Sequence, residues 1–568
     1  MYKFQVDKIT VSKIDGDLDI IPKSVNIIIG PNNSGKSRFL KEIRDYMSGD
    51  NRELKIIKSI EHNMPDSLED FDASYQISER MTQDRYGNWA VRFYSNKPNQ
   101  ELDMSSSLEN FYSRGFNYIG GSWREFFRNF IEQKDKMQFL QHCGGIFFQY
   151  IGTEERLTIC KTQRNYGCED GNINYLSMCK FKQELLKDLN ENIFKLFKKQ
   201  IFLDFYSLGQ KIAFRIGDDF SYMFKTTNPN TSDINQLMRE SKLDDQGDGL
   251  KSYVSTFLAL NLQESNILLI DEPEAFLHPP LARQLGELIG QVNDETKQVF
   301  VATHSVEVLK GILSTGTDVN IIRITQPQQG QNEINIIDNL LLQSILERPL
   351  LRVSRVMEGL FCEKVIITES EADELVYQEL TEKLYPQSGL YFAHGQNKQT
   401  LVEIAEMYQR IGISYEIIVD FDVLRRPDEF QKFLSLMPFD ERWRQRLISY
   451  SNNLRDIVNN SVCIDGLSSE DAKQEQKSQR DKVYHEIGVS FFSDLADKIY
   501  DTLKQLSENH LQVLESGELE TLLIPYGIPY NSNKKEWIEL AISKIQDLCI
   551  EDISSESAIR KIIDNIIK

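Results

Sequence analysis

The residues best suited to chemistry near the start of the chain form a glycine-rich loop. Gly30-Pro-Asn-Asn-Ser-Gly-Lys-Ser37 has the spacing G-x-x-x-x-G-K-[ST], which is typical of loops that bind nucleotide phosphates. The backbone N–H groups of such a loop, and of the helix after it, bind anionic oxygens. We expect Lys36 to reach the β- and γ-phosphates of ATP and Ser37 to ligate Mg²⁺. The residues predicted to bind the nucleotide are Gly30, Asn32, Asn33, Ser34, Gly35, Lys36 and Ser37.

Two apolar stretches far downstream end in residues that would complete a site for ATP hydrolysis. The first runs from Asn266 to the adjacent carboxylates of Asp271 and Glu272. Asp271 is predicted to join the Mg²⁺ shell, and Glu272 to polarise the attacking water. The second stretch runs from Gln298 to His304, whose imidazole we expect to hydrogen-bond the γ-phosphate.

A short glycine-containing segment lies before the acidic stretch. Gln246-Gly-Asp-Gly-Leu-Lys-Ser252 is followed by the apolar residues 253–262, so its glycines would precede a helix. The first N–H groups of a helix are free to bind an anion, and we predict that Gly247, Gly249 and Ser252 contact a nucleotide. The alternative is a flexible glycine-rich loop that binds nothing.

Carboxylates also follow two predicted strands in the second half of the chain. The first strand is followed by Glu369 and, four residues later, by Asp373; the second, Tyr415–Val419, is followed by Asp420 and Asp422. Since alternate residues of an extended chain face the same side, Asp420 and Asp422 are expected to point together. Carboxylate oxygens suit Mg²⁺ or Mn²⁺, and two such ions can assist phosphodiester cleavage. The alternative is an acidic turn without a metal.

Composition limits the class of protein that must position these residues. A chain of 568 residues predicts two to four domains, and 40% hydrophobic and 27% charged residues are typical of soluble globular proteins. The sequence has no run of about 18 apolar residues and no apolar leader, so we expect neither a membrane span nor a signal peptide. The seven cysteines show no zinc spacing and are expected to be thiols of a cytoplasmic protein.

The charge balance argues against indiscriminate binding of nucleic acid, because the formal net charge is −21. One segment around Trp443 is locally basic and could bind phosphates, with the tryptophan stacking on a base. A solvated helix face is an equally good interpretation of it. The basic residues concerned are Arg425, Arg426, Lys432, Arg442, Arg444 and Arg446.

The order of phosphate loop, glycine-led helix, acidic strand and histidine strand resembles the ABC-type ATPases. The resemblance implies that the glycine-led helix contacts ATP held by an opposite subunit, so that the ATPase domains form a head-to-tail homodimer or a higher oligomer. The LSGGQ signature sequence of that family is absent. Gly247-Asp-Gly-Leu-x-Ser252 is closer to the shorter signature sequence of OLD-type ATPases. The segment Glu274–Pro279 also resembles the ExxLHP segment of those ATPases.

The two acidic strands resemble the TOPRIM domain of topoisomerases, primases and OLD nucleases. The segments Val356–Val365 and Gly395–Lys398 resemble the OLD (overcoming lysogenization defect) form of that domain. The resemblance implies a later carboxylate that binds a second metal ion, for which Glu520 is the best match. It also implies a lysine that stabilises the phosphate, for which Lys534 and Lys535 are candidates and Lys535 is taken as catalytic. The family usually has glycine where this chain has Ser370, which makes the position of Asp373 less certain.

The predicted fold class is therefore α/β. We expect an ABC-type P-loop ATPase domain over residues 1–338, with a helical insertion at roughly 50–240. A helical linker is expected over 339–362, a TOPRIM domain with a Rossmann-like parallel sheet over 363–530, and a C-terminal helical segment over 531–568.

The resemblance implies an ATP-binding and ATP-hydrolysing, Mg²⁺- or Mn²⁺-dependent DNA endonuclease that acts in antiphage defence, alone or with a partner protein or nucleic acid. In that reading the catalytic residues are Glu272, His304, Glu369, Asp420, Asp422 and Lys535. Two alternatives remain open. One is an ATP-driven sensor or scaffold with a weak TOPRIM site, and the other is a DNA-repair ATPase of the ABC type without nuclease activity.

Overall fold

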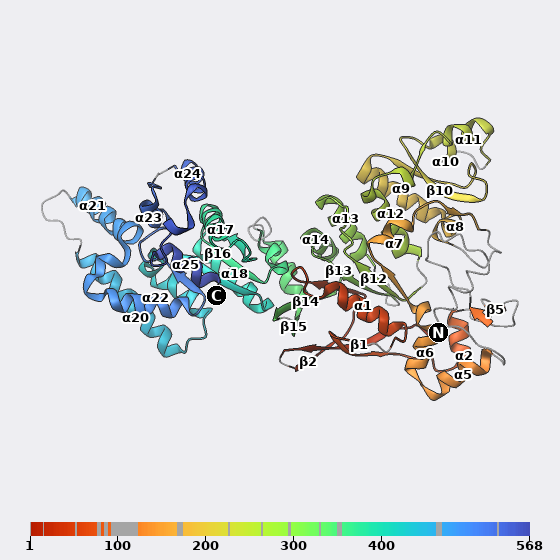
Figure 1. Cartoon of the computed structure of the whole chain (residues 1–568), viewed down its shortest axis with the longest axis horizontal. Coiled ribbons are helices and arrows are strands. Elements are labelled where there is room, and N and C mark those ends of the chain that lie inside the picture. Colours follow the sequence, from red (N-terminus) through yellow and green to blue (C-terminus); the bar gives the residue numbers. More distant parts are fainter. Residues whose placement is uncertain are drawn as a thin grey trace. The chain divides into compact units, whose positions relative to one another are not determined.

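The computed structural model shows an α/β chain that divides into two compact units, Met1–Gln343 and Ser344–Lys568 (Figure 1). The residues that the structure describes are 2–14, 16–50, 54–75, 81–83, 89–91, 123–166, 174–224, 228–262, 265–292, 297–328, 331–348, 355–461, 469–530 and 533–567.

A six-stranded sheet in the order β15-β14-β3-β13-β12-β7 forms the centre of the first unit. All neighbouring strands are parallel except the edge pair β14 and β15. Strands β3, β12 and β13 are buried along their whole length, as expected for a continuous apolar run covered on both faces. The strands of this sheet are β3 Val25–Ile29, β7 Phe148–Ile151, β12 Ile267–Asp271, β13 Gln298–Ala302, β14 Val319–Gln328 and β15 Gln331–Ile337.

The carboxyl ends of the parallel strands meet at one edge, which is where open α/β sheets place their ligands. Helix α1 (Lys36–Met47) follows β3 directly and packs on β12 and β13. Its apolar face, with Phe39 and Ile43, shares one core with an antiparallel sheet of order β2-β1-β4. The strands of that sheet are β1 Val6–Lys13, β2 Gly16–Ile20 and β4 Ile57–His62.

The range 50–240, expected to be a helical insertion, contains strands as well as helices. It supplies β4 to the antiparallel sheet and β7 to the edge of the central sheet, so part of it belongs to the body of the ATPase unit. A further small sheet of β8, β9, β10 and β11 lies in the same range or just beyond it. The sequence pattern could not show that β7 belongs to the central sheet, because β7 is a short strand and its partner β12 lies more than a hundred residues away in the sequence.

The first unit contains further helices and strands, and the last of them, α15, continues past the unit boundary at Gln343. The helices are α2 Leu68–Tyr75, α5 Trp123–Gln133, α6 Lys136–Phe147, α7 Thr153–Thr158, α8 Tyr175–Cys179, α9 Gln183–Phe197, α10 Ser221–Phe224, α11 Thr231–Leu237, α12 Asp248–Leu262, α13 Pro279–Gly290, α14 Val306–Ser314 and α15 Asn339–Glu347, with the 3₁₀ turn η1 Leu243–Asp245. The other strands are β5 Met81–Gln83, β6 Trp89–Val91, β8 Gln163–Arg164, β9 Gln200–Asp204, β10 Lys211–Gly217 and β11 Ser241–Lys242.

The second unit is built on a four-stranded, wholly parallel sheet in the order β17-β16-β18-β19. Helix α17 (Glu371–Leu384) leaves β16, and α18 (Lys398–Ile411) connects β17 to β18. The C-terminal helices α24 and α25 pack on α17 and share one core with the sheet, in which Trp537 is fully buried. The strands are β16 Lys364–Thr368, β17 Tyr391–His394, β18 Ser414–Val419 and β19 Leu511–Val513.

Helices and tight turns complete the second unit. The α-helices not yet given are α19 Pro427–Ser435, α20 Glu441–Ser461, α21 Ser469–Lys482, α22 Ala496–Ser507, α23 Leu519–Leu523, α24 Lys534–Asp547 and α25 Ala558–Ile567. The tighter turns are η2 Arg355–Phe361, η3 Phe421–Arg425, η5 Gly488–Leu495, η6 Ile524–Tyr526 and η7 Ile550–Asp552, and η4 Val483–Ile487 is a π-helix.

Candidate functional site

The phosphate loop of the first unit connects the end of β3 to the start of α1. Gly30 and Gly35 have φ angles of 144° and 100°, and Asn33 has a φ of 61°. A Cβ atom on Gly30 would lie 2.0 Å from the carbonyl oxygen of Ile324, so no other residue fits there. Gly35 caps α1 without a side chain, which leaves the first N–H groups of the helix to bind an anion.

Lys36 and Ser37 lie where the sequence predicts them, on the first turn of α1. The Lys36 ammonium donates to the carbonyl oxygens of Gly30 at 2.9 Å and Pro31 at 2.7 Å. Burial lowers the pKa of Lys36, although nearby carboxylates, Glu272 foremost, oppose the shift. The Ser37 hydroxyl donates to Asp271 Oδ1 at 2.9 Å. The loop and the acidic strand therefore form one site, in which these two oxygens could share a cation.

Two residues of the range 148–158 join this site and were not foreseen. The Tyr150 hydroxyl donates to Asp271 Oδ2 at 2.9 Å, and burial together with the neighbouring Asp271 raises the pKa of Tyr150. The Arg156 guanidinium donates to the main-chain oxygens of Asp271 at 2.5 Å and Glu272 at 2.6 Å. Both come from β7 and α7, whose place beside β12 no local pattern reveals.

His304 follows β13 and lies beside the acidic residues, as predicted. Its Nδ1 is 3.8 Å from Glu272 Oε1, and its Nε2 is 3.6 Å from Glu274 Oε1. Glu274 also accepts from the backbone N–H of His304 at 2.9 Å and from the Thr303 hydroxyl at 2.8 Å. Glu274, which the sequence marks only within the ExxLHP resemblance, thus holds the histidine segment against the acidic strand.

The glycine-led helix requires one correction. Helix α12 begins at Asp248, with Gly247 exposed and Gly249 partly exposed, as a surface that contacts a nucleotide requires. Ser252, by contrast, is fully buried one turn into the helix. The prediction that Ser252 contacts a nucleotide is therefore wrong for this conformation, because the apolar face that begins there turns its side chain inward.

The carboxylates of the second unit meet at the carboxyl edge of its parallel sheet. Glu369, Asp420 and Asp422 each offer an oxygen within 4.8 Å of the others. Glu369 follows β16, and its Oε1 accepts from the backbone N–H of Asp420 at 3.1 Å, which ties the two strand ends together. Asp420 and Asp422 converge for a different reason from the one predicted. The strand ends at Val419, and the turn of η3 brings Asp422 beside Asp420.

The electrostatics of this carboxylate cluster favour a bound cation. Burial, and then the charges of Asp422 and Asp373, raise the pKa of Glu369 to about 7. Burial and the charge of Glu369 raise the pKa of Asp420 well above its ordinary value. Crowded carboxylates of this kind cannot all ionise without a compensating positive charge.

Lys398 supplies such a charge and was not predicted as a site residue. Its ammonium donates to Asp422 and lies 3.6 Å from Glu369 Oε2. Burial is the largest influence on the pKa of Lys398 and lowers it, but Glu369 and Asp422 together outweigh burial, so the pKa is raised. The only sequence signal was the Gly395–Lys398 segment, which the OLD resemblance had marked without giving the lysine a role.

Asp373 lies near the carboxylate cluster, but its side chain is hydrogen-bonded to Ser370. Its Oδ2 accepts from the backbone N–H of Ser370 at 3.0 Å and from the Ser370 hydroxyl at 2.9 Å, and it forms the capping box of α17. The serine that replaces the family's glycine therefore caps the helix. Asp373 is not one of the three carboxylates that approach one another, so the structure does not support its prediction as a direct metal ligand.

The later residues also depart from prediction. Lys534 and Lys535 are both exposed, and Lys534 Nζ lies 3.8 Å from Glu520 Oε1. Successive residues on a helix point about 100° apart, so only one of them can face the site. Of the two candidates, Lys534 is the one that approaches a predicted site residue, and a catalytic role for either lysine stays a prediction. Glu520 is buried beside Lys534 and outside the carboxylate cluster, whereas Glu518, not predicted, is among the charges that raise the pKa of Asp420.

The donor atoms at each site fit the ligand that the sequence predicts. The first site suits a nucleoside triphosphate with its magnesium ion. It offers the uncapped N–H groups at the start of α1 and the Lys36 ammonium for the phosphates, and the Ser37–Asp271 pair for the metal. Glu369, Asp420 and Asp422 offer only oxygen ligands, which suit Mg²⁺ or Mn²⁺.

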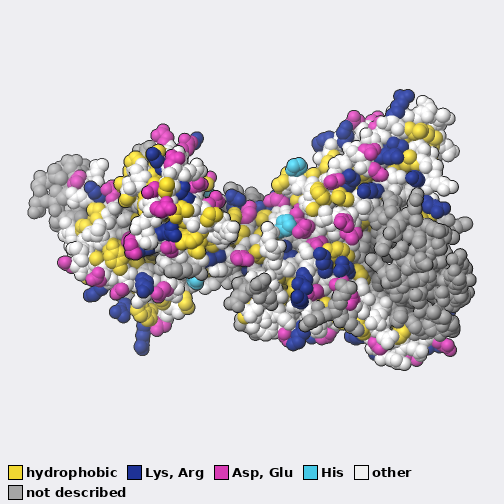
Figure 2. Space-filling model, in the orientation of Figure 1, with side chains coloured by type: hydrophobic (Ala, Val, Ile, Leu, Met, Phe, Trp, Pro, Cys, Tyr) yellow, Lys and Arg dark blue, Asp and Glu magenta, His cyan; other side chains and the backbone are white. Residues whose placement is uncertain are grey.

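The basic segment that begins with Arg425, the last residue of η3, is partly neutralised by ion pairs with nearby carboxylates. Arg425 pairs with Asp481 at 2.7 Å, and Arg426 pairs with Glu429 at 2.7 Å. On the face shown in Figure 2, Lys and Arg side chains are interspersed with Asp and Glu. Within the described ranges, no helix has both the length and the apolar character that crossing a bilayer requires.

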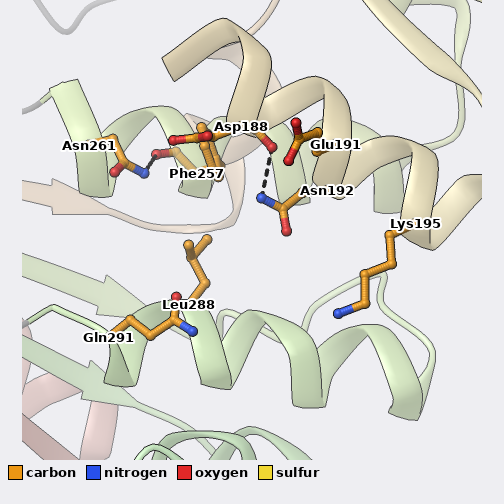
Figure 3. A pocket seen from close by; sticks show the side chains of 8 residues that line it. All are labelled: Asp188, Glu191, Asn192, Lys195, Phe257, Asn261, Leu288 and Gln291. Carbon is orange, nitrogen blue, oxygen red and sulfur yellow. Dashed lines mark hydrogen bonds between the residues drawn. The ribbon is translucent and has the colours of Figure 1, made fainter. Parts of the chain in front are cut away.

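A pocket of about 380 Å³ lies between α9, α12 and α13 and shares no lining residue with either site (Figure 3). The carboxylates of Asp188 and Glu191 line the pocket from α9, and both apolar and polar side chains line it from the other two helices. The lining residues are Asp188, Glu191, Asn192, Lys195, Phe257, Asn261, Leu288 and Gln291.

Known protein families match a part of each unit. Residues 200–310 match the AAA_21 model, an AAA domain whose description mentions the AbiEii toxin and type IV TA systems. Residues 360–422 match the TOPRIM domain of overcoming-lysogenization-defect-like proteins. The chain is 21% identical over 314 residues to Old nuclease of Escherichia phage P2, a match that covers 53% of this chain and 49% of that protein. The chain thus spans about half the length of this relative.

Solved structures that resemble part of the chain include heads of SMC proteins. An Smc head bound to the C-terminal winged-helix domain of ScpA is 12% identical, with a TM-score of 0.33, and covers 59% of this chain and 98% of its own. The SMC head domain from Thermotoga maritima is 14% identical, with a TM-score of 0.28, and covers 59% of this chain and 99% of its own. The family matches show that this chain joins an ATPase domain to an OLD-like TOPRIM domain, which confirms the resemblance inferred from the sequence.

Proposed function

We propose, from the union of an ATPase domain with an OLD-like TOPRIM domain, that this protein is an ATP-hydrolysing, divalent-metal-dependent DNA endonuclease of OLD type. The observation that carries the nuclease part is the carboxylate cluster of Glu369, Asp420 and Asp422 at the edge of a parallel sheet. The similarity to Old nuclease supports the same reading. A role in antiphage defence in the cytoplasm belongs to the proposal through the OLD resemblance alone.

In the nuclease reaction, the three carboxylates would hold one Mg²⁺ or Mn²⁺. A divalent ion bound there supplies Lewis-acid activation of the phosphate and of a nucleophilic water. Lys398 is placed to balance negative charge on the phosphate, because its ammonium already contacts Asp422 and Glu369. Lys534 lies 3.8 Å from Glu520 Oε1, and its charge opposes the burial that raises the pKa of Glu520.

In the ATPase reaction, Lys36 and the loop N–H groups would bind the phosphates, and Ser37 and Asp271 would hold the magnesium ion. Glu272 is the proposed base for the attacking water, and His304 contacts its carboxylate at 3.8 Å. The exposed Gly247 at the start of α12 fits contact with ATP on a second copy. We therefore propose a homodimer through the ATPase units, which positions or gates DNA for cleavage.

A plasmid-nicking assay tests the proposal. Supercoiled plasmid is incubated with purified protein and Mg²⁺ or Mn²⁺, with and without ATP. We expect nicking that is lost in Asp420→Ala and retained in Lys36→Ala, since the two chemistries use separate residues. Cleavage that persists in Asp420→Ala would place the chemistry elsewhere.

A second candidate function is an ATP-driven sensor or scaffold that does not cut DNA. The observation in its favour is the contact of Lys398 with Asp422, because an ammonium in the carboxylate cluster can take the place of a metal ion. ATP turnover without nicking at any metal concentration would establish this function instead.

A further inference from the structure

Arg156 is a buried cation with unusual partners. Its side chain is fully buried on α7, and two of its nitrogens donate to the main-chain oxygens of Asp271 and Glu272. Its third nitrogen, Nε, is buried without a hydrogen-bond partner. Within the described ranges, the hydrogen bonds that Arg156 donates thus go to main-chain oxygens. Burial lowers the pKa of Arg156, and the charges of Glu274, Asp271 and Glu272 oppose that shift. A guanidinium that is fully buried carries a desolvation cost, which suggests a specific task.

The backbone that Arg156 contacts is strained. Glu272 has a φ angle of 50°, in the left-handed region that side chains other than glycine rarely adopt. The Glu272 N–H donates to the carbonyl oxygen of Ala302 at 2.8 Å, and the Asp271 carbonyl of the same peptide accepts from Arg156, so β13 and Arg156 both hold this peptide. Strained residues persist where the surrounding structure enforces them, and they cluster at active sites.

The helix that carries Arg156 also runs along the glycine-led helix. α7 packs on α12, and the segment after α7 continues this contact. Cys160 Sγ donates to the carbonyl oxygen of Lys251 at 3.6 Å, and the Thr162 N–H donates to Asp244 Oδ1 at 3.0 Å. The segment from Arg156 to Thr162 therefore connects the acidic strand end to η1 and to the first turn of α12.

We propose that Arg156 is a positioning residue for ATP hydrolysis. It fixes the backbone of Glu272 so that the carboxylate faces the γ-phosphate, and through α7 it couples that carboxylate to the helix that contacts the second copy. This inference rests on the ATPase part of the proposed function. It gives Arg156 no contact with ATP, so removing its guanidinium should slow hydrolysis and leave binding intact.

A double-mutant cycle separates this role from a structural one. ATP turnover and the affinity for N-methylanthraniloyl-ATP are measured for the full chain and for Arg156→Gln, Glu272→Gln and the double variant. We expect Arg156→Gln to lower kcat by about 10- to 100-fold, with the Kd for the analogue changed less than about threefold. We expect the double variant to be no slower than Glu272→Gln alone, because Arg156 acts through Glu272.

Arg156→Lys and Arg164→Gln complete the design. Lysine retains a donor for the carbonyls and should recover part of the lost kcat, whereas Arg164, which lies on β8, should tolerate the change. If circular dichroism shows that Arg156→Gln is unfolded, the same cycle is run with Arg156→Lys. Additive losses in the double variant, or parallel losses of affinity and kcat, would overturn the inference. A wild-type protein without ATP turnover would instead refute the ATPase function itself.

Discussion

The ammonium group of Lys398 donates directly to the carboxylate of Asp422. The two residues come from the helix after β17 and the turn after β18, and they meet at the carboxyl edge of the parallel sheet. The pair places a positive charge inside a cluster of acids whose pKa values are raised by burial and mutual repulsion. This relationship makes the carboxylate cluster a candidate for phosphate as well as metal binding.

Replacement of Lys398 by alanine tests the value of that charge. We expect Lys398→Ala to lower the rate of plasmid nicking by about 100-fold, because a preorganised cation at a developing negative charge contributes on that scale. Nicking is followed on gels at saturating Mg²⁺, so that altered metal affinity does not dominate the result.

The matched control lies at the other end of β16, the strand that Glu369 follows. Lys364 begins β16 and pairs with the buried Glu416 at 3.4 Å. Lys364→Ala removes a comparable ion pair away from the carboxylate cluster and should leave the nicking rate within about twofold. Equal losses in the two variants would indicate that both act through folding alone.

Metal affinity should depend on pH with a definite sign. The pKa of Glu369 is raised from its ordinary value of 4.5 to about 7, so the folded protein keeps a proton that the unfolded chain loses. In metal-free protein, the stability from this group is therefore full below pH 4.5 and is lost as the pH rises toward 7. Since Mg²⁺ requires the ionised carboxylate, its apparent affinity should rise between pH 6 and pH 8.

Thermal unfolding provides the measurement. The increase in Tm caused by Mg²⁺ should be larger at pH 8 than at pH 6, and Glu369→Gln should remove most of that difference. A Mg²⁺-induced shift in Tm that is the same at both pH values would argue against metal binding by Glu369.

Ser37 should matter for magnesium more than for the nucleotide itself. Its hydroxyl donates to Asp271 Oδ1 at 2.9 Å, so Ser37→Ala removes a bond to a charged group and a predicted metal ligand. We expect the affinity for ATP with Mg²⁺ to fall about tenfold, which corresponds to a bond of about 1.5 kcal/mol, with little change in affinity for ATP under EDTA. Isothermal titration calorimetry measures both.

Ser48 offers a control at the opposite end of α1. Its hydroxyl donates to the carbonyl oxygen of Arg44 at 2.9 Å, and Ser48→Ala should change neither affinity. If Ser37→Ala binds ATP with Mg²⁺ as tightly as the wild type, the assignment of this hydroxyl to the metal is wrong.

The C-terminal helix α24 should be essential to the second unit. Trp537 is fully buried in the core that the helix shares with the parallel sheet. We expect Trp537→Ala to destabilise that unit by about 3–5 kcal/mol, measured by urea unfolding. Trp443, whose residue is 37% exposed, is the matched control, and Trp443→Ala should cost less than about 1 kcal/mol. Equal costs would mean that α24 contributes little to the unit.

Local patterns of sequence were sufficient for the residues whose neighbours lie close in the chain. The strand, loop and helix around Lys36, and the strands that end in Asp271 and Glu369, follow from apolar runs and the residues that end them. Parallel strands bring such ends to one edge, so the meeting of Ser37 with Asp271 and of Glu369 with Asp420 could be anticipated.

Tertiary packing alone decided which distant side chains join those sites and which leave them. Tyr150 and Arg156 reach Asp271 only because β7 pairs with β12, and Lys398 reaches Asp422 only because α18 starts beside the turn after β18. Helix phase brought Lys534 within 3.8 Å of Glu520. The sequence by itself determined the chemical groups and the strands that carry them, because these depend on near neighbours. The direction of each side chain depends on long-range pairing and helix phase, which a linear pattern does not encode.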